Sequence, residues 1–283
     1  MSVETPATED EQQDLHGHMS FLDHLEELRK RIIHSLIGVG VALCISWWAA
    51  GYLFRLVSRP IVAAGVQLNM TKPTEGFNLE LKLAILAAVF LAAPYILAQV
   101  WLFIAPGLYK HERRYALPFI IFSSLLFVIG GLFGYFVAFP FAIQFLIGWG
   151  KDMGLTTIIS ATEYFDLFVM VELGLGIVFE IPALIFILSR IGLVSAGFLL
   201  RNTRYAILVA FIIAAIITPT TDIPNMLIMA VPMILLYFLG VFASYLLVMR
   251  REKRRFPWRA FIYWFIAVSV VASICMAIVI RWR

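Results

Sequence analysis

Apolar residues gather in seven long runs that are separated by short polar segments. The runs cover about residues 32–54, 81–104, 115–147, 163–189, 204–217, 226–248 and 260–280. A helix needs about 20 mostly apolar residues to cross about 30 Å of hydrocarbon. The pattern therefore predicts an all-α polytopic membrane protein.

Two of these runs have unusual lengths. The third is 33 residues long and carries Pro118 and Pro140 near its ends, so we expect it to tilt or bend. The fifth has only 13 residues from Tyr205 to Ile217, about 20 Å of helix. Either the turn TPTTDIPN that follows lies low and the bilayer thins there, or the run extends further. Pro219 argues against a longer helix.

A polar segment, SFLDHLEELRKRI at residues 20–32, precedes the first run. Ser20 and Asp23 form an S-x-x-D capping pattern typical of a helix start. Apolar residues recur at helical spacing, and the opposite side is charged. We therefore expect an amphipathic helix that lies at the membrane interface and leads into the first span.

The composition agrees with a membrane protein. Hydrophobic residues make up 62% and charged residues 14%, against about 25% charged in soluble domains. The formal charge of +4 reflects basic loops and does not indicate a nucleic-acid partner. Cys44 and Cys275 both lie within apolar runs, so they predict neither a disulfide framework nor a metal site. Residues 1–19 are polar and acidic, and we interpret them as a disordered cytoplasmic tail.

Lysine and arginine predict the orientation. With the N-terminus in the cytoplasm, the inner face receives 15 basic residues and the outer face 7. The bias favours a cytoplasmic N-terminus, and seven spans would place the C-terminus outside. The loop FIAPGLYKHERR at 103–114 is then cytoplasmic, as is the basic linker 251–259.

Two acids lie on the predicted cytoplasmic side. Glu27 is on the amphipathic helix, where an ordinary ion pair with Arg31, one helical turn later, is the alternative to a binding role. Glu112 stands among basic neighbours in the loop, where it either balances local charge or binds a cationic ligand. A carboxylate can accept a bidentate contact from a guanidinium group, which is stronger than a neutral hydrogen bond.

Two further acids lie within the fourth run. Glu180, in GIVFEIPALI, lies deep within the run, nine residues from its nearer end, where a charge is costly and indicates function. Pro182 frees a backbone carbonyl nearby. Glu172 lies two turns earlier, and its role stays open. A polar contact between helices is the alternative for both acids. Asp222 follows in an outer turn, where a turn-capping role is favoured.

Other chemistry is not indicated. The histidines lie in the tail or on the cytoplasmic side, so no mid-membrane pair could hold haem. The chain has no nucleophile elbow, zinc-protease motif or phosphate-binding loop, and we predict no enzyme activity, cofactor or metal. Gly130 and Gly134 form one G-x-x-x-G pattern, a common helix-packing signal.

Several motifs resemble the TatC family, the core receptor of the twin-arginine protein translocase. They are HLEELRKRI at 24–32, LAAPYILAQVW at 91–101, FIAPGLYKHERR at 103–114, FEIPALI at 179–185 and the ITPT…D turn at 217–222. The resemblance covers about residues 20–250, and the cytoplasmic loop is its most specific part.

The resemblance implies a fold. We expect a six-span, TatC-like concave bundle with short fifth and sixth helices, Pro232 marking the effective start of the sixth. Residues 20–250 would form this membrane domain, and residues 260–280 an extra seventh C-terminal span that the family lacks.

The resemblance also implies site residues. Signal-peptide binding is expected at Glu27 and Glu112, with Phe103, Gln99 and Arg29 nearby. Glu26 adjoins Glu27, and the register of the motif favours Glu27. Residues with expected roles in partner binding or transport are Glu180, Asp222, Pro60 and Phe77, of which the two last would shape the outer cap.

The predicted function is a receptor in a bacterial-type cytoplasmic (inner) membrane. It would bind the paired arginines of signal peptides on folded cargo and scaffold the single-span partners TatA and TatB, as part of a homo- or hetero-oligomer. The proton-motive force powers transport in the family. The alternative is a proton-coupled small-solute transporter that uses Glu180, although no internal repeat is evident.

Overall fold

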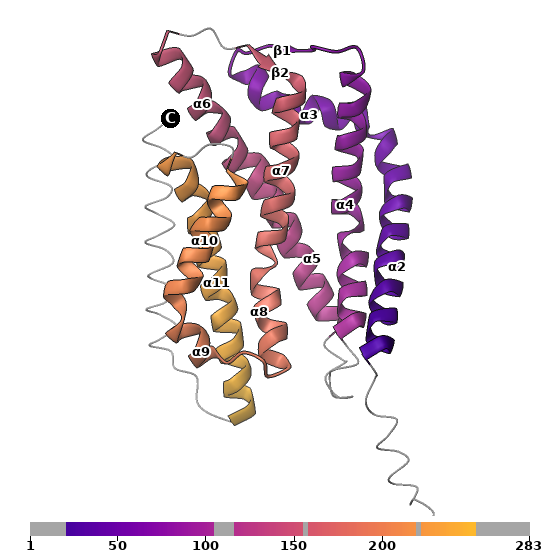
Figure 1. Cartoon of the computed structure of the whole chain (residues 1–283), viewed down its shortest axis with the longest axis vertical. Helices are drawn as coiled ribbons and strands as arrows, with labels where there is room; N and C mark the ends of the chain where they lie inside the picture. Colours follow the sequence, from indigo (N-terminus) through magenta and orange to yellow (C-terminus); the bar gives the residue numbers. More distant parts are fainter. Residues whose placement is uncertain (1–20, 105–115, 155–157, 219–221, 253–283) are drawn as a thin grey trace, which may run out of the picture.

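The structure is a computed structural model that describes residues 21–104, 116–154, 158–218 and 222–252. Over these residues the chain is mostly helical, and most helices run along the long axis of the molecule (Figure 1). The helices are α2 (Phe21–Trp48), α3 (Ala50–Ala63), α4 (Glu75–Ile104), α5 (Ala116–Phe133), the π-helix η3 (Gly134–Ala138), α6 (Phe139–Asp152), α7 (Ala161–Phe179), α8 (Ile181–Arg190), α9 (Ala196–Arg201), α10 (Thr203–Ile217) and α11 (Ile223–Glu252).

Two short strands mark one end of the bundle. β1 (Leu68–Asn69) and β2 (Ile159–Ser160) pair in parallel, and α3 lies at the same end (Figure 1). The orientation predicted from charge makes this the outer end, and we use that name below. The opposite, inner end holds α9, the start of α2 and the end of α4.

The predicted spans are confirmed as helices for the first six runs. Five helical segments of the described chain are long and apolar enough to cross a membrane: Leu22–Trp48, Glu75–Ile104, Ala116–Asp152, Ala161–Arg190 and Ile223–Leu246. A sixth, Thr203–Ile217, is apolar but shorter. Residues 1–19, most of the linker 251–259 and the whole of 260–280 lie outside the described residues, so the tail, the linker and the seventh span stay predictions.

The first run ends earlier than predicted. The amphipathic segment leads directly into the span, as expected, and the two form one continuous helix, α2. The span ends at Trp48 rather than residue 54, since the chain turns at Ala49 into α3. Residues 50–54 therefore belong to the outer cap.

The third run was predicted to tilt or bend, and a π-helix interrupts it. Within it, the backbone N–H of Phe139 donates to the carbonyl of Gly134, a five-residue step that defines the π-helix η3. Pro140 follows directly and has no N–H to donate to the carbonyl of Phe136, so the regular helical pattern cannot continue through this point. The combined α5–η3–α6 segment crosses the bundle obliquely (Figure 1).

The fifth predicted span is short, as expected, and the sixth is not. The 15 residues of α10 correspond to about 22 Å of helix. In contrast, α11 has 30 residues and passes through Pro232, which therefore does not mark its start. A proline within a helix removes one hydrogen bond, and packing against α8 and α10 supports α11 despite this loss.

Close helix contacts use small residues. Helix α2 packs chiefly on α4, where Ala42, Ala88 and Ala92 form a buried cluster and Gly38 lies against the ring of Tyr95. Small side chains let helix backbones approach closely in a membrane, where no water drives association. Because α2 contacts little else, the site between α2 and α4 depends on this seam.

The core lies where α3 meets α4, α6 and α7. Tyr164 is 1% exposed, and its hydroxyl donates to the backbone carbonyl of Val57 at 2.8 Å. Phe139 and Phe165 are fully buried beside it, with Phe139 and Tyr164 ring centroids 5.1 Å apart. This aromatic cluster fixes the outer cap to the spans.

The G-x-x-x-G pattern packs α5 against α7, as its helix-packing interpretation predicted. A Cβ atom on Gly130 would lie 2.8 Å from the backbone carbonyl oxygen of Leu175 and 3.0 Å from Cβ of Phe179. A Cβ on Gly134 would lie 2.8 Å from an oxygen of the Glu172 carboxyl group. Neither contact leaves space for a side chain.

We expect Gly130→Ala to lower the free energy of unfolding by about 1–3 kcal/mol, because the backbone of α7 must move to accept the added methyl group. Gly148→Ala on α6 is the matched control, since nothing lies within 4 Å of its Cβ position and alanine favours a helix. Thermal unfolding of the purified protein measures both. Equal unfolding temperatures for the two variants would contradict the close α5–α7 contact.

Candidate functional site

A polar cluster joins α2 to α4 at the inner end. One guanidinium nitrogen of Arg31 (Nη2) donates to Oε1 of Glu27 at 3.1 Å, and the other (Nη1) donates to Oε1 of Gln99 at 3.4 Å. His24 and Phe103 stack beside it, with ring centroids 4.5 Å apart. We call these five residues the α2–α4 cluster.

Helical spacing brings these groups together. Residues 24, 27 and 31 are three and four positions apart on α2, so they share one face. Gln99 and Phe103 are likewise four apart on α4. Within the α2–α4 cluster, therefore, one face of each helix supplies the side chains that meet.

The α2–α4 cluster is sheltered but incomplete. The side chains of Glu27 and Arg31 are 15% and 25% exposed, and Gln99 is buried. Oε2 of Glu27 and Nε of Arg31 are buried and have no hydrogen-bond partner within the part of the chain that the structure describes. One carboxylate oxygen is thus available to a second donor, and the site already accepts a guanidinium group.

The other residues predicted for this site are not members of the α2–α4 cluster. Glu26 and Arg29 are exposed on α2, so the geometry favours Glu27 over its neighbour. Glu112 and its loop lie outside the described residues. The loop begins directly after α4 ends at Ile104, just past Phe103. The carboxylate of Glu112 stays a predicted second group for binding arginine.

The predicted site lacked two members of the cluster, His24 and the charged Arg31. The i,i+4 spacing of Arg31 from Glu27 indicated the ion pair, and that pair is formed. Its contact with Gln99, 68 residues away, could not be predicted without knowing how α2 and α4 align.

Glu180 occupies a break between α7 and α8. Glu180 is the last residue before α8, and Pro182 lies in the first turn of that helix. The hydroxyl of Ser123 on α5 donates to Oε2 of Glu180, whereas Oε1 is buried with no hydrogen-bond partner in the described residues. The hydrogen bond from Ser123 supports a polar contact between helices, and the oxygen without a partner among the described residues supports a functional role.

Pro60 shapes the outer cap through a specific hydrogen bond. Pro60 lies inside α3 and cannot donate to the carbonyl of Leu56, four residues earlier. The hydroxyl of Tyr135, in η3, donates to that carbonyl at 2.9 Å. The cap is therefore joined to the third span at the carbonyl that the proline leaves free.

A double-mutant cycle tests this link. Tyr135→Phe should destabilise the protein by about 1–2 kcal/mol, because it leaves the half-buried carbonyl of Leu56 unpaired. In a Pro60→Ala background the same change should cost much less, since the substituted alanine would supply a backbone N–H to that carbonyl. Unfolding measurements on the four proteins give the coupling, and additive effects would contradict the link.

The remaining predicted residues lie at the outer end. Phe77 is 60% exposed, and its ring meets Trp47 edge-on at 5.8 Å, which joins the end of α2 to the start of α4. Asp222 precedes α11, where Oδ1 accepts from the backbone N–H of Asn225 at 2.8 Å. This is the turn-capping role favoured from the sequence. Roles for either residue in transport stay predictions.

The described residues contain no group of three or more histidine, cysteine or acidic side chains that could hold a metal ion. The α2–α4 cluster instead combines a sheltered carboxylate, an amide and stacked rings close to Ile104, where α4 ends.

Comparisons with known proteins agree with this arrangement. The sequence profile of the family described as "Sec-independent protein translocase protein (TatC)" matches residues 23–232. The chain is 49% identical over 243 residues to the Sec-independent protein translocase protein TatC of Koribacter versatilis, covering 84% of this chain and 89% of that protein. It is 34% identical over 238 residues to the TatC of Aquifex aeolicus, covering 83% and 98%.

A solved structure shares the fold. The crystal structure described as "Twin Arginine Translocase Receptor- TatC in DDM" superposes with a TM-score of 0.71 at 35% identity, covering 78% of this chain and 99% of that one. The residues matched by the family profile include the α2–α4 cluster, Glu180 and the outer cap. The chain is therefore a multi-pass membrane protein of the TatC family, a component of the Sec-independent protein translocase rather than an enzyme.

Proposed function

We propose that the chain is the receptor subunit that binds paired arginines of signal peptides on folded cargo. It would act in the cytoplasmic (inner) membrane with its N-terminus in the cytoplasm and, if residues 260–280 span, its C-terminus outside. The relatives named above are translocase proteins, and none of them supports the alternative of a proton-coupled small-solute transporter.

One observation carries this proposal. Glu27 binds the guanidinium group of Arg31 in a sheltered site, and its second oxygen has no hydrogen-bond partner among the described residues. Arginine suits such a site because its planar fork matches a carboxylate, whereas lysine is a point charge. Glu112, in the loop after α4, would hold the second arginine of the pair. The apolar part of the signal peptide would then lie along the apolar spans.

Arg31 has a role in the peptide-free protein that follows from this proposal. It would occupy the place of a signal-peptide arginine at Glu27 when no peptide is bound. A peptide arginine must then displace or share this contact, and Gln99 would retain Arg31 after displacement through the hydrogen bond it already accepts.

Arg31→Gln is therefore expected to tighten binding of a twin-arginine peptide by about threefold to tenfold, since removing an internal competitor of about 1 kcal/mol has this effect. Lys30→Gln is the control, because it removes the same charge from an exposed neighbour. Fluorescence anisotropy with a labelled peptide measures both. Weaker binding by Arg31→Gln would mean that Arg31 positions Glu27 rather than competes for it.

The proposal extends to protein partners. Oε1 of Glu180 lies within a span and has no partner in the part of the chain that the structure describes, so a polar side chain of TatA or TatB could pair with it. The chain would then act as the scaffold of a hetero-oligomer.

Binding of the peptide itself tests the proposed function. The full chain in lipid discs should bind a signal peptide with two arginines about tenfold or more tightly than the same peptide with two lysines, because charged bidentate contacts are lost with lysine. Equal affinities would remove the recognition role.

A further inference from the structure

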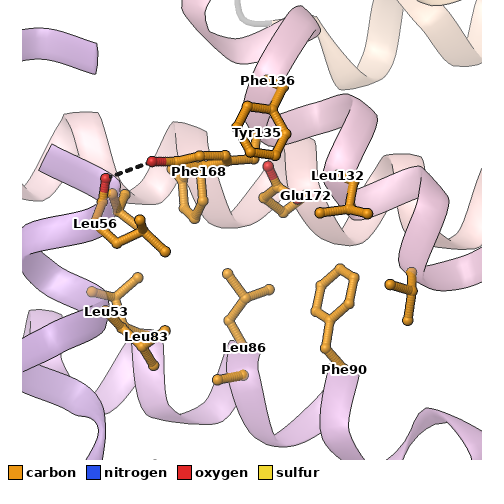
Figure 2. A pocket seen from close by; sticks show the side chains of 14 residues that line it. Leu53, Leu56, Leu83, Leu86, Phe90, Leu132, Tyr135, Phe136, Phe168 and Glu172 are labelled. Carbon is orange, nitrogen blue, oxygen red and sulfur yellow. Dashed lines mark hydrogen bonds between the residues drawn. The ribbon is translucent and has the colours of Figure 1, made fainter. Parts of the chain in front are cut away.

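An apolar pocket lies in the outer half of the bundle, between α4 and α5 and beneath α3. Its volume is about 360 Å³, and its walls are almost entirely aliphatic and aromatic. Figure 2 shows Leu86 and Phe90 of α4 on one side, with Tyr135 and Phe168 on the other. Pockets that bind small molecules begin at about this volume.

One carboxyl group reaches this apolar space. Glu172 of α7 lines the pocket and is 4% exposed (Figure 2). Its Oε1 is buried and has no hydrogen-bond partner among the residues that the structure describes. The ion pairs found between described residues involve other acids. Tyr135 is the other polar side chain of the wall, and its hydroxyl is used by Leu56.

The helix packing holds this carboxyl group close to the third span. A Cβ atom on Gly134 would lie 2.8 Å from Oε1 of Glu172, and one on Gly131 would lie 3.3 Å from Oε2, so the glycines leave the space that the carboxyl group uses. A buried acid with no cation beside it is far more stable when protonated, because a charge there would be poorly solvated. A protonated carboxyl group has one O–H donor to offer.

The mouth of the pocket lies on the surface of a span that we expect to face lipid. Three of its lining residues are exposed on the surface of the spans: Val128 by 39%, Leu132 by 51% and Phe136 by 69%. These side chains lie on the third span, at membrane depth, so the molecules that reach the pocket are dissolved in hydrocarbon.

We propose that this pocket binds a lipid-soluble alkyl carbonyl compound whose carbonyl oxygen accepts a hydrogen bond from Glu172. The alkyl chain would pack against the apolar walls, and the carbonyl oxygen would accept a hydrogen bond from the protonated carboxyl group of Glu172. A bound water needs two to four polar partners, which these walls do not supply. The inference is independent of signal-peptide binding.

The test uses the full chain in lipid discs and dicyclohexylcarbodiimide, a lipid-soluble reagent for protonated carboxyl groups. The acid adds across one C=N bond: its proton goes to nitrogen, its oxygen bonds to carbon, and the acyl group then migrates to nitrogen with nothing lost. Peptide mass spectrometry locates the adduct. The competing probes are 2-undecanone and undecane, which differ by the carbonyl group.

We expect Glu172 to be labelled, and 2-undecanone to slow this labelling about fivefold more than undecane at equal membrane concentration, the factor that one net hydrogen bond represents. Ala87→Leu narrows the pocket while keeping the acid and should slow labelling too. Glu172→Gln should remove the adduct while the adduct at Glu180 is unchanged.

Three results would overturn the proposal. Labelling of Glu180 without Glu172 would show that lipid-soluble molecules do not reach the carboxyl group. Equal protection by the ketone and the alkane would show that the carbonyl group is not recognised. Protection by a single-span peptide and by neither probe would show that the pocket receives a protein side chain.

Discussion

Replacing Glu27 by glutamine is expected to weaken binding of a twin-arginine peptide about tenfold or more. A hydrogen bond to a charged group contributes about 1.5–3 kcal/mol, and the amide loses the charge while keeping the shape. The side chain of Glu27 is 15% exposed, so solvent screens the contact only in part. Anisotropy titration of the variant in lipid discs measures the loss.

Glu26→Gln is the matched control for this prediction. It removes the same charge one residue earlier, from a side chain that is exposed on α2. It should leave affinity within about twofold, as expected for a screened surface charge. If Glu26→Gln were the more damaging change, the register that assigns recognition to Glu27 would be wrong. Glu112→Gln should resemble Glu27→Gln while the protein still inserts.

Replacing Glu180 by alanine should separate the two proposed roles of the protein. Peptide binding should be unchanged, because the α2–α4 cluster lies at the inner end on other helices. Association with TatA and TatB should fall about tenfold, the effect of losing an intramembrane contact of about 1–2 kcal/mol. Quantitative co-purification of both partners measures this.

The control here must distinguish partner binding from local packing. Ser123→Ala removes the hydroxyl that donates to Glu180 and leaves the acid in place. It should reduce partner association less than Glu180→Ala. If the two variants were equal, the acid would act as a structural contact between α5 and the α7–α8 break. Unchanged co-purification with Glu180→Ala would remove the partner role.

The sequence predicted the spans well because membrane helices follow from composition. Hydrocarbon requires long apolar runs, so the first six runs could be located and are confirmed as helices, and the short α10 could be recognised from its length alone. The errors arose at the ends of spans. The apolar run continues to residue 54, yet the first span ends at Trp48 because the chain turns at Ala49 into α3. Conversely, Pro232 is a helix breaker that α11 tolerates.

The candidate site could be predicted only in part. Glu27 and Arg31 are paired by local spacing, which the sequence contains. The contacts of Arg31 with Gln99 and of Tyr135 with Leu56 join residues 68 and 79 positions apart. Such contacts depend on how helices align along one another, and helical periodicity does not determine that alignment. The pocket at Glu172 is inaccessible to sequence reasoning for the same reason.

Site-specific crosslinking can show whether the arginine pair of a signal peptide binds at the α2–α4 cluster. A signal peptide carrying a photoreactive residue beside its arginine pair would be bound to the full chain in lipid discs, and the crosslinked positions mapped by mass spectrometry. We expect adducts on the inner ends of α2 and α4, around Glu27 and Gln99. These adducts should disappear when the two arginines of the peptide are replaced by lysines. Adducts elsewhere, or adducts that persist with lysines, would contradict the assignment of arginine recognition to the α2–α4 cluster.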